Sequence, residues 1–276
     1  MTSNKTNINT ENESDLVLKE VAGVGILKLT MNDIKRRNAL SEEMLAALSN
    51  AFYQAQSDCS VRVIILAAKG PVFSAGHDLK QMTAARANAD NGRAYFAEVL
   101  SACSALMQLI VNHPKPIIAE VTGVATAAGC QLVASCDLAL AADSALFSTP
   151  GVHIGLFCST PMVALSRNVS NKAAMEMLLT GEMVSATKAE HIGLVNRVVT
   201  EEKLAQETIA MAALIASKSA MTLATGKQAF YKQQEMTLTD AYDYASQVMV
   251  DNLLKSDAEE GMNAFIEKRS PQWQDK

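Results

Sequence analysis

Residues 116–137 read PIIAEVTGVATAAGCQLVASCD, and the fold prediction starts from this stretch. Residues 116–121 are apolar apart from Glu120 and predict a largely buried strand. Small residues fill 122–129, and an apolar run typical of a short helix continues to Cys136. The first N–H groups of such a helix lack partners within it and carry a partial positive charge. The junction therefore suits an anion or a developing oxyanion, although close packing of helix on strand explains the small residues equally well.

A second junction of this kind lies earlier in the chain. Residues 61–67 read VRVIILA and predict a strand buried on both faces, and the loop 69–80 that follows contains FSAGHDLK at 73–80. Gly76 and its small neighbours allow a backbone N–H to approach a ligand closely. An ordinary turn between strand and helix is the alternative interpretation.

The rest of the chain predicts an α/β fold, because strands and helices alternate up to about residue 159. Ser41 is expected to cap a helix, and helical segments follow one another after residue 159. We therefore expect a disordered polar tail at 1–14, an α/β core at 15–200 and a helical region at 201–276. The other predicted strands are 16–21, 25–30, 138–141, 145–148 and 194–199, and a long helix is predicted at 92–111.

Composition excludes several classes of function. The net charge of −5 and an aromatic content of 5% argue against nucleic-acid binding. No run of about 18 apolar residues is present, so no membrane span is expected. The first residues lack the apolar core of a signal peptide, which predicts a cytoplasmic location and leaves the mitochondrial matrix open for a eukaryotic chain.

Cysteines and nucleotide motifs give no sign of a resident cofactor or metal. The five cysteines include no CxxC pair, so structural zinc and a disulfide framework are not expected. GxGxxG, GxxxxGK[ST] and GxSxG are all absent, which disfavours dinucleotide, P-loop and α/β-hydrolase sites.

The two junctions together resemble the signature of the enoyl-CoA hydratase/isomerase (crotonase) superfamily. The matching segments occur in order and with the family's spacing, from about residue 16 to residue 275. Three stretches, 74–80, 126–137 and 148–161, match one subgroup of the family best. The segments that carry the resemblance are AGHDLK at 75–80, KPIIAEVTG at 115–123, GCQL at 129–132, CD at 136–137, KRRNALS at 35–41 and GMNAFIEKR at 261–269.

The resemblance implies a crotonase-type ββα spiral core, with the C-terminal helices mediating assembly into trimers or dimers of trimers. It implies an acyl-CoA thioester as substrate in fatty acid metabolism, with coenzyme A arriving as part of that substrate. The backbone N–H groups of His77 and Ala128 match the two that hold the thioester oxygen and stabilise an enolate. The positions that match coenzyme A contacts are Lys35, Arg37, Ala39, Ala75, Asp78, Leu79, Lys80, Phe265 and Lys268, the last two from a neighbouring subunit.

Two departures from the family pattern bear on the reaction. A standard hydratase uses two glutamates, and this chain has Gln131 and Gly151 at those positions. Neither residue exchanges a proton near neutral pH, so the usual two-carboxylate hydration is not supported. Of the possible substitutes, His77 has the best case and Asp78 borders the same loop, while a hydrogen-bonded packing role explains His153 better.

Asp137 also matches a family position, and a role in a turn explains it better than catalysis. Cys158 is expected to be an inert buried thiol, and Glu120 requires a partner if it faces the core.

Three functional interpretations remain open. The first is a lyase-type enzyme that stabilises an enolate, by hydration or by a decarboxylation such as that of the similar methylmalonyl-CoA decarboxylase branch. The second is a non-catalytic acyl-CoA-binding or assembly subunit, which the missing glutamates favour. The third is an unrelated α/β enzyme with accidental motif matches.

Overall fold

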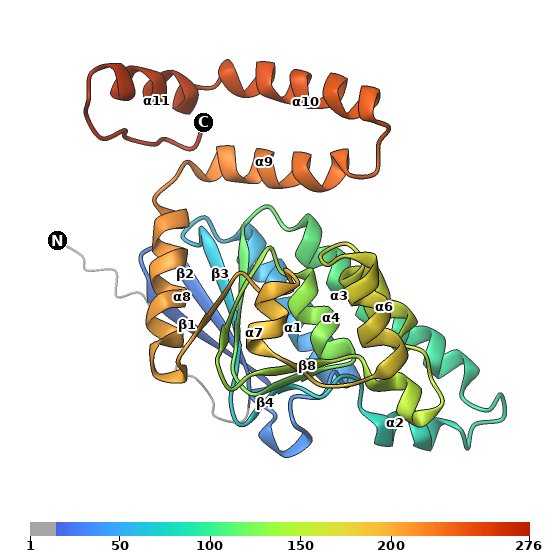
Figure 1. The fold of residues 1–276 in the computed structure, drawn as a ribbon. Coiled ribbons are helices and arrows are strands. Elements are labelled where there is room, and N and C mark those ends of the chain that lie inside the picture. The colour runs from blue at the N-terminus through green and yellow to red at the C-terminus, as the bar shows by residue number, and fades with distance from the viewer. Residues whose placement is uncertain (1–14) are drawn as a thin grey trace.

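The computed structural model describes residues 15–276, and the predicted tail at 1–14 lies outside the described residues. Figure 1 shows two sheets surrounded by helices, with the last helices extending to one side. The first sheet has six strands in the order β1-β2-β3-β5-β7-β10. Their bounds are β1 Val17–Gly23, β2 Ile26–Met31, β3 Val63–Ala68, β5 Ile117–Val121, β7 Leu138–Ala142 and β10 Arg197–Val199.

The second sheet has four strands in the order β4-β6-β8-β9. Strands β4, β6 and β8 run parallel, and β9 joins β8 antiparallel. Their bounds are β4 Val72–Ser74, β6 Val124–Thr126, β8 Leu146–Ser148 and β9 Val184–Ser185. Of these strands the sequence predicted only β8, because segments this short have too little apolar alternation to stand out from loops.

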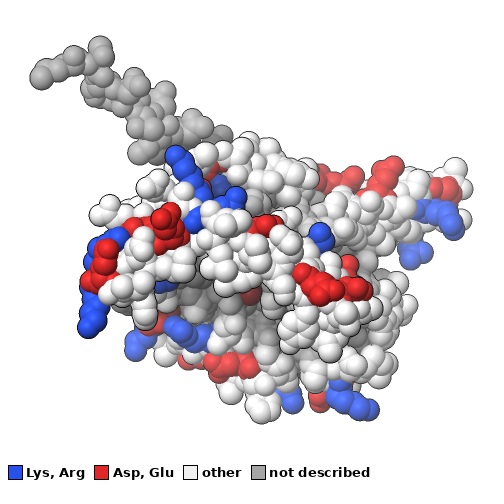
Figure 2. All heavy atoms as spheres, turned by 90° about the horizontal axis from the view of Figure 1, so that it is seen from above, with Lys and Arg blue, Asp and Glu red and all other residues white. Residues whose placement is uncertain are grey.

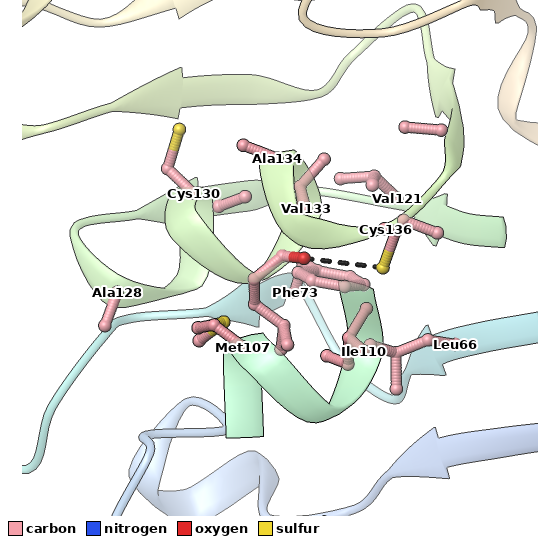
Figure 3. Packing of buried hydrophobic residues seen from close by; sticks show 14 of the residues in the cluster. Leu66, Phe73, Met107, Ile110, Val121, Ala128, Cys130, Val133, Ala134 and Cys136 are labelled. Atoms are coloured by element: carbon pink, nitrogen blue, oxygen red, sulfur yellow. Dashed lines mark hydrogen bonds between the residues drawn. The ribbon is translucent and has the colours of Figure 1, made fainter. Parts of the chain in front are cut away.

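Helices cover both faces of the first sheet. On one face lie α1 (Glu42–Ser57), α3 (Arg93–Asn112) and α4 (Ala128–Ser135), and on the other lies α8 (Glu201–Ala216). Figure 3 shows Phe73 of β4 meeting Met107 of α3 and Val133 of α4 in this core. As predicted, the Ser41 hydroxyl caps α1 by accepting the Met44 N–H at 3.2 Å.

The helices after residue 159 follow the predicted segments within a few residues, whereas α2 was not predicted. Because α8 packs on the sheet, the part that leaves the core begins after it, later than the predicted boundary at residue 201. The bounds are α2 Leu79–Ala85, α5 Ser159–Leu165, α6 Asn171–Thr180, α7 Ala186–His191, α9 Ala220–Gln233, α10 Leu238–Leu253 and α11 Ser256–Ile266, with 3-10 turns at Ile34–Arg36 and Pro150–Ile154.

Helix α3 is long and apolar enough to cross a membrane by length and composition alone, as is the sharply bent pair α8–α9. Within the described part of the chain, α3 instead packs against α1 and α4. Its residues Val99, Cys103, Leu106 and Ile110 are buried there. Core helices of globular domains carry the same apolar stripe, so α3 does not indicate a membrane protein.

Helices α9, α10 and α11 leave apolar side chains uncovered. Figure 2 views the molecule from this side and shows basic and acidic residues mixed, with wide uncharged areas between them. Large exposed apolar side chains gathered on neighbouring helices commonly mark an interaction site. The exposed apolar residues of these helices are Phe230, Leu238, Tyr242, Met249, Val250, Leu253, Met262, Phe265 and Ile266.

Asp137 anchors α9 to the core, which corrects the turn role expected from the sequence. Its carboxylate accepts the Ile117 N–H at 2.7 Å and the Tyr231 hydroxyl at 3.0 Å, and it pairs with Lys227 Nζ at 2.7 Å. Lys227 also donates to the carbonyl of Ile110 at 3.0 Å. The position between β5 and β7 makes this residue a structural tie between two parts of the fold.

Stability is expected to fall as the pH falls from 7.5 to 5.5, because His113 is buried in its neutral form. Its Nε2 lies 3.2 Å from the Phe52 carbonyl, and its Nδ1 accepts the Lys115 N–H at 3.1 Å. Burial lowers the pKa of His113, and also that of His77, below the ordinary value of 6.5. The unfolded chain therefore binds protons that the folded chain does not, and each histidine contributes at most about 1.4 kcal/mol per pH unit.

Urea unfolding midpoints at several pH values measure this slope. A His113→Gln variant is expected to have a shallower slope than the parent between pH 7.5 and 5.5. An unchanged slope in that variant would contradict the assignment of the pH dependence to this histidine.

Candidate active site

Three parallel strands of the second sheet end at one edge. Strand β4 leads into Ala75, Gly76 and His77, β6 leads into the start of α4, and β8 leads into Thr149. The carboxyl ends of neighbouring parallel strands lie together, and ligands commonly bind there in α/β proteins. The two junctions singled out in the sequence thus meet at this edge.

The two junctions are in backbone contact, and glycine is required at both. A Cβ on Gly76, whose φ is +82°, would lie 2.8 Å from Ala127 Cβ and 3.1 Å from Ala128 N. A Cβ on Gly129 would lie 2.3 Å from the Ser74 carbonyl oxygen. Such approaches are open only to a residue without a side chain.

The amides of His77 and Ala128 are the free donors of this edge. Neither donates a hydrogen bond to another residue of the described chain. Adjacent backbone groups are engaged: Leu40 N–H donates to the Gly76 carbonyl at 2.8 Å, and Ala127 N–H donates to the Ser148 carbonyl at 3.0 Å. Ala127 holds a positive φ of 51° at the N-cap of α4, a conformation that costs energy and is typical of functional turns.

Buried polar atoms without partners accompany these amides. Within residues 15–276, neither ring nitrogen of His77, nor Gln131 Oε1, nor Thr149 Oγ1 has a hydrogen-bond partner. Gln131 is 4% exposed and Thr149 is 1% exposed. Buried polar groups are normally paired, so these atoms indicate a site that a polar ligand or water completes. Burial also lowers the pKa of His77, which keeps its ring neutral near pH 7.

Thr149 was not among the residues predicted from the sequence. Its only sequence signal was its position two residues before Gly151, at the end of a short strand. The hydroxyl that precedes it, Ser148 Oγ, lies 2.8 Å from Thr126 Oγ1 and ties β8 to β6. This tie holds Thr149 at the edge where His77 and Ala128 lie.

The surroundings of Gly151, which the sequence pattern matches to the second glutamate of a standard hydratase, are filled by a sulfur atom and by backbone. Gly151 N–H donates to Cys158 Sγ at 3.3 Å. A Cβ on Gly151 would lie 2.9 Å from that sulfur and 2.9 Å from the Leu156 carbonyl oxygen. Burial raises the pKa of Cys158, so the thiol is neutral, in line with the inert thiol predicted for this position.

A Gly151→Ala variant is therefore expected to be less stable by about 1–3 kcal/mol, as for other overpacked sites. Urea unfolding measures the loss. Gly155→Ala offers a contrast, because a Cβ there meets no atom within 4 Å, although its positive φ still disfavours alanine. Unchanged stability in the Gly151→Ala variant would contradict the importance of the contact with Cys158, since Gly151 does not have a positive φ that alanine would strain.

The other candidate side chains have structural partners or lie at the surface. Asp78 caps α2, with Oδ1 accepting the N–H groups of Lys80 at 2.9 Å and Gln81 at 3.3 Å. His153 is exposed, and a Cβ on Gly181 would lie 2.8 Å from its Nε2. Asp78 therefore has a structural role as the N-cap of α2. His153 is exposed, unlike His77.

Glu120 is buried, and Lys28 is the partner that a buried carboxylate requires. Lys28 Nζ lies 2.7 Å from Glu120 Oε1, so the carboxylate is paired across the first sheet. Among the described residues, no group of three or more His, Cys, Asp or Glu is arranged to hold a metal ion.

Part of the predicted coenzyme A set is brought together beside this edge. Ala75 N–H donates to the Arg37 carbonyl at 3.1 Å, and Lys35 and Arg37 line a cavity of about 150 Å³. Ala39 is buried nearby in sequence, and Leu79 and Lys80 begin the exposed face of α2. Phe265, 85% exposed, lies at the end of α11, and Lys268 follows two residues after that helix. Helix α11 lies far from β4 within the same chain (Figure 1).

Comparison with protein families gives one model that matches most of the chain. The model described as enoyl-CoA hydratase/isomerase matches residues 22–276. Among characterised sequences, the rat protein named "Enoyl-CoA hydratase domain-containing protein 3, mitochondrial" is 53% identical over 250 residues, which cover 90% of this chain and 81% of the rat protein. The human protein of the same name is 50% identical over 249 residues, with 90% and 80% covered.

Solved structures agree with these sequence matches. The crystal structure of the human domain-containing protein 3 has a TM-score of 0.88 at 48% identity, covering 94% of this chain and 100% of that one. An enoyl-CoA hydratase structure from Mycobacterium smegmatis has a TM-score of 0.90 at 49% identity, covering 94% and 99%. The predicted spiral fold and the predicted subgroup, that of domain-containing protein 3, are both confirmed. The expected cytoplasmic location gains no support, since the rat and human relatives are named mitochondrial.

Proposed function

Because this chain belongs to the enoyl-CoA hydratase/isomerase family, we propose that it binds acyl-CoA thioesters and stabilises an enolate derived from the bound acyl group. The observation that carries this proposal is the pair of unengaged amides, His77 N–H and Ala128 N–H, on two loops in backbone contact. Both amides belong to the backbone, so their action does not depend on side-chain chemistry.

The amides act on the thioester carbonyl oxygen. When a bond to the carbon next to the carbonyl breaks, its electron pair moves onto that oxygen as an enolate. Fixed N–H dipoles meet the new charge without reorganising, and the N-terminus of α4 adds the favourable end of a helix dipole at Ala128. The site thus favours reactions whose intermediate carries negative charge on this oxygen.

Conventional hydration fits the site poorly. The amide of Gln131 exchanges no proton near neutral pH, and the surroundings of Gly151 leave no room for a carboxylate side chain. The neutral groups around the hole favour an enolate step that needs no carboxylate base. Loss of carbon dioxide from a malonyl-type thioester is one such step, because breaking the carbon–carbon bond itself supplies the electron pair.

The coenzyme A portion of the thioester is assigned to the residues that match the coenzyme A contacts of the family. Lys35 and Arg37 provide cationic groups for phosphates. Phe265 and Lys268 are proposed to complete the site from a neighbouring subunit, since α11 is remote from β4 in its own chain (Figure 1). The exposed apolar residues of α9 to α11 support a homotrimer or a dimer of trimers in which this surface is covered.

Turnover of a thioester panel tests the proposal. The purified protein is incubated with crotonyl-CoA, with saturated acyl-CoA esters and with malonyl-type esters, and products are identified by mass spectrometry. We expect little loss of the conjugated enoyl absorbance of crotonyl-CoA and protein-dependent conversion of at least one other thioester. Conversion of none of them would exclude an enzymatic role for this site.

A non-catalytic acyl-CoA-binding subunit is the second candidate. The loss of both family carboxylates, at Gln131 and Gly151, favours it. Calorimetry separates the candidates, because a binder holds acyl-CoA without releasing a product. If no coenzyme A ester binds, both proposals fail.

A further inference from the structure

The three helices α9, α10 and α11 form an arm that is attached to the rest of the molecule largely by polar contacts. Within the part of the chain that the structure describes, no apolar side chain of α9 or α10 is buried. Burial of apolar surface is what usually fixes a helix on a core, so polar contacts carry more of the attachment here. The Asp137 tie holds α9, and the position of α11 depends on other contacts.

The chain beyond α11 supplies some of those contacts, because it turns back toward α9 (Figure 1). Asp257, in the first turn of α11, is 1% exposed, and its two carboxylate oxygens accept the N–H groups of Gln274 at 2.7 Å and Asp275 at 3.0 Å. Burial of a carboxylate is costly unless donors of this kind satisfy it. Residues 272–276 thus form a strap that Asp257 holds along α11.

Trp273, the single tryptophan of the chain, joins the strap to the corner between α8 and α9. Its indole N–H donates to the Ser217 carbonyl, just after α8, at 2.9 Å. Its ring lies against α11, because a Cβ on Gly261 would be 3.2 Å from the ring. Glu260, one residue earlier, accepts the Gln272 N–H at 2.7 Å. One side chain therefore contacts both the corner and the face of α11.

Asp275 joins the same corner to the core. Its Oδ2 lies 2.7 Å from Arg62 Nη1 and its Oδ1 lies 3.3 Å from Arg62 Nη2, and Oδ1 also accepts the Ala220 N–H at the start of α9 at 2.7 Å. Arg62 directly precedes β3, and its Nε donates to the carbonyl of Ala216, the last residue of α8, at 2.8 Å. A two-point contact between arginine and carboxylate fixes orientation as well as distance. The strap thereby connects the core, the corner and α11.

The end of α11 carries the two residues assigned to coenzyme A. Phe265 lies one residue before the end of the helix, and Lys268 follows in a turn with a φ of +56°. The Arg269 N–H closes this turn by donating to the Ala264 carbonyl at 2.9 Å. The Arg269 guanidinium contacts both carboxylate oxygens of Glu260, at 2.6 and 2.9 Å. Because Glu260 also holds the strap, the turn and the strap share one anchor on α11.

We propose that the strap fixes the direction in which α11 projects from the core, with Trp273 and Asp275 as positioning residues for Phe265 and Lys268. The inference rests on the proposed function, in which the last two residues reach the coenzyme A portion of a thioester bound to a neighbouring subunit. Side chains that are held in place before binding lose less freedom when the ligand arrives. The strap is therefore expected to raise affinity for coenzyme A esters and to leave the oxyanion amides unchanged.

Calorimetric titration with butyryl-CoA tests the strap, at a protein concentration at which light scattering gives the parent and the variants the same mass. Trp273→Ala is expected to weaken binding about tenfold. Trp273→Phe, which keeps an aromatic ring against Gly261, should weaken it less. Asp275→Ala, which removes the contact with Arg62, should act in the same direction as Trp273→Ala. Tyr53→Ala, an exposed aromatic residue of α1, is the matched control and should bind like the parent.

A combined variant shows whether the strap acts through the end of α11. In a background that carries Phe265→Ala and Lys268→Ala, the further change Trp273→Ala should alter affinity less than about twofold, because residues that act through one another are not additive. A further tenfold loss in that background would overturn the positioning role. Hydrogen exchange of the α11 amides gives a readout without ligand, and it should be faster in Trp273→Ala than in Trp273→Phe.

The outcomes separate this inference from the proposed function. Parental affinity for butyryl-CoA in Trp273→Ala, or unchanged hydrogen exchange of α11, would overturn the strap while leaving acyl-CoA binding in place. Failure of the parent protein to bind any coenzyme A ester would overturn the proposed function, and the positioning role with it.

Discussion

A His77→Pro variant is expected to lose about 100- to 1000-fold in the rate of any enolate-forming step, the usual effect of removing one oxyanion donor. Proline has no backbone N–H, so one of the two free amides at the strand edge disappears. Lys35 and Arg37, which are assigned to the phosphates of coenzyme A, lie on another segment, so affinity for the thioester should change less than the rate. Steady-state kcat and KM on the thioester that the panel identifies measure the two effects separately.

A His77→Ala variant keeps the amide and removes only the ring. Its rate reports on the unpartnered imidazole of His77, and a rate near that of the parent would confine the role of this residue to its backbone. If proline and alanine at position 77 reduce the rate equally, the amide is not the acting group. The infrared carbonyl frequency of a bound thioester provides a readout without turnover, because the proline variant should lose part of the polarisation of this bond.

An Asp137→Ala variant is expected to lose about 3–5 kcal/mol of stability, the typical cost of removing one partner of a buried ion pair. The change leaves Lys227 Nζ buried without its carboxylate and also leaves the Ile117 N–H and the Tyr231 hydroxyl without an acceptor. Burial raises the pKa of Asp137 and lowers that of Lys227, so each group depends on the other to stay charged inside the fold. Urea unfolding followed by circular dichroism measures the loss.

Two further variants separate the ion pair from its hydrogen bonds. Tyr231→Phe removes one hydrogen bond and should cost about 1 kcal/mol. Asp137→Leu combined with Lys227→Met replaces the pair by apolar groups, and should cost much less than Asp137→Ala, since no charge is left alone. A double variant as unstable as the single one would mean that hydrogen bonds to the backbone, rather than charge pairing, dominate at Asp137.

Local patterns of apolar and polar residues were sufficient to predict most of the helices and longer strands. The apolar stripe of α1 and its Ser41 cap, the buried runs of β3 and β5, and the helices after residue 159 all lie within a few residues of their predicted positions. Such elements follow from the periodicity of apolar side chains, which is written into short windows of sequence. The family pattern added the order of the motifs and predicted that Gln131 and Gly151 stand where a standard hydratase has glutamates.

What the sequence by itself determined was therefore the α/β fold and the family. It also predicted the two backbone donors on which the proposed function rests. The tertiary structure alone decided how distant segments meet. Strands β4 and β6 have no local signal, because pairing with each other gives them their shape, and that pairing brings Gly76 against Ala127. The partners of Asp137 and Glu120 come from α9 and β2, far away in the chain, and burial forced these pairings. Asn38 joins distant segments for the same reason, because its buried side chain donates hydrogen bonds to the carbonyls of Lys69 and Val72.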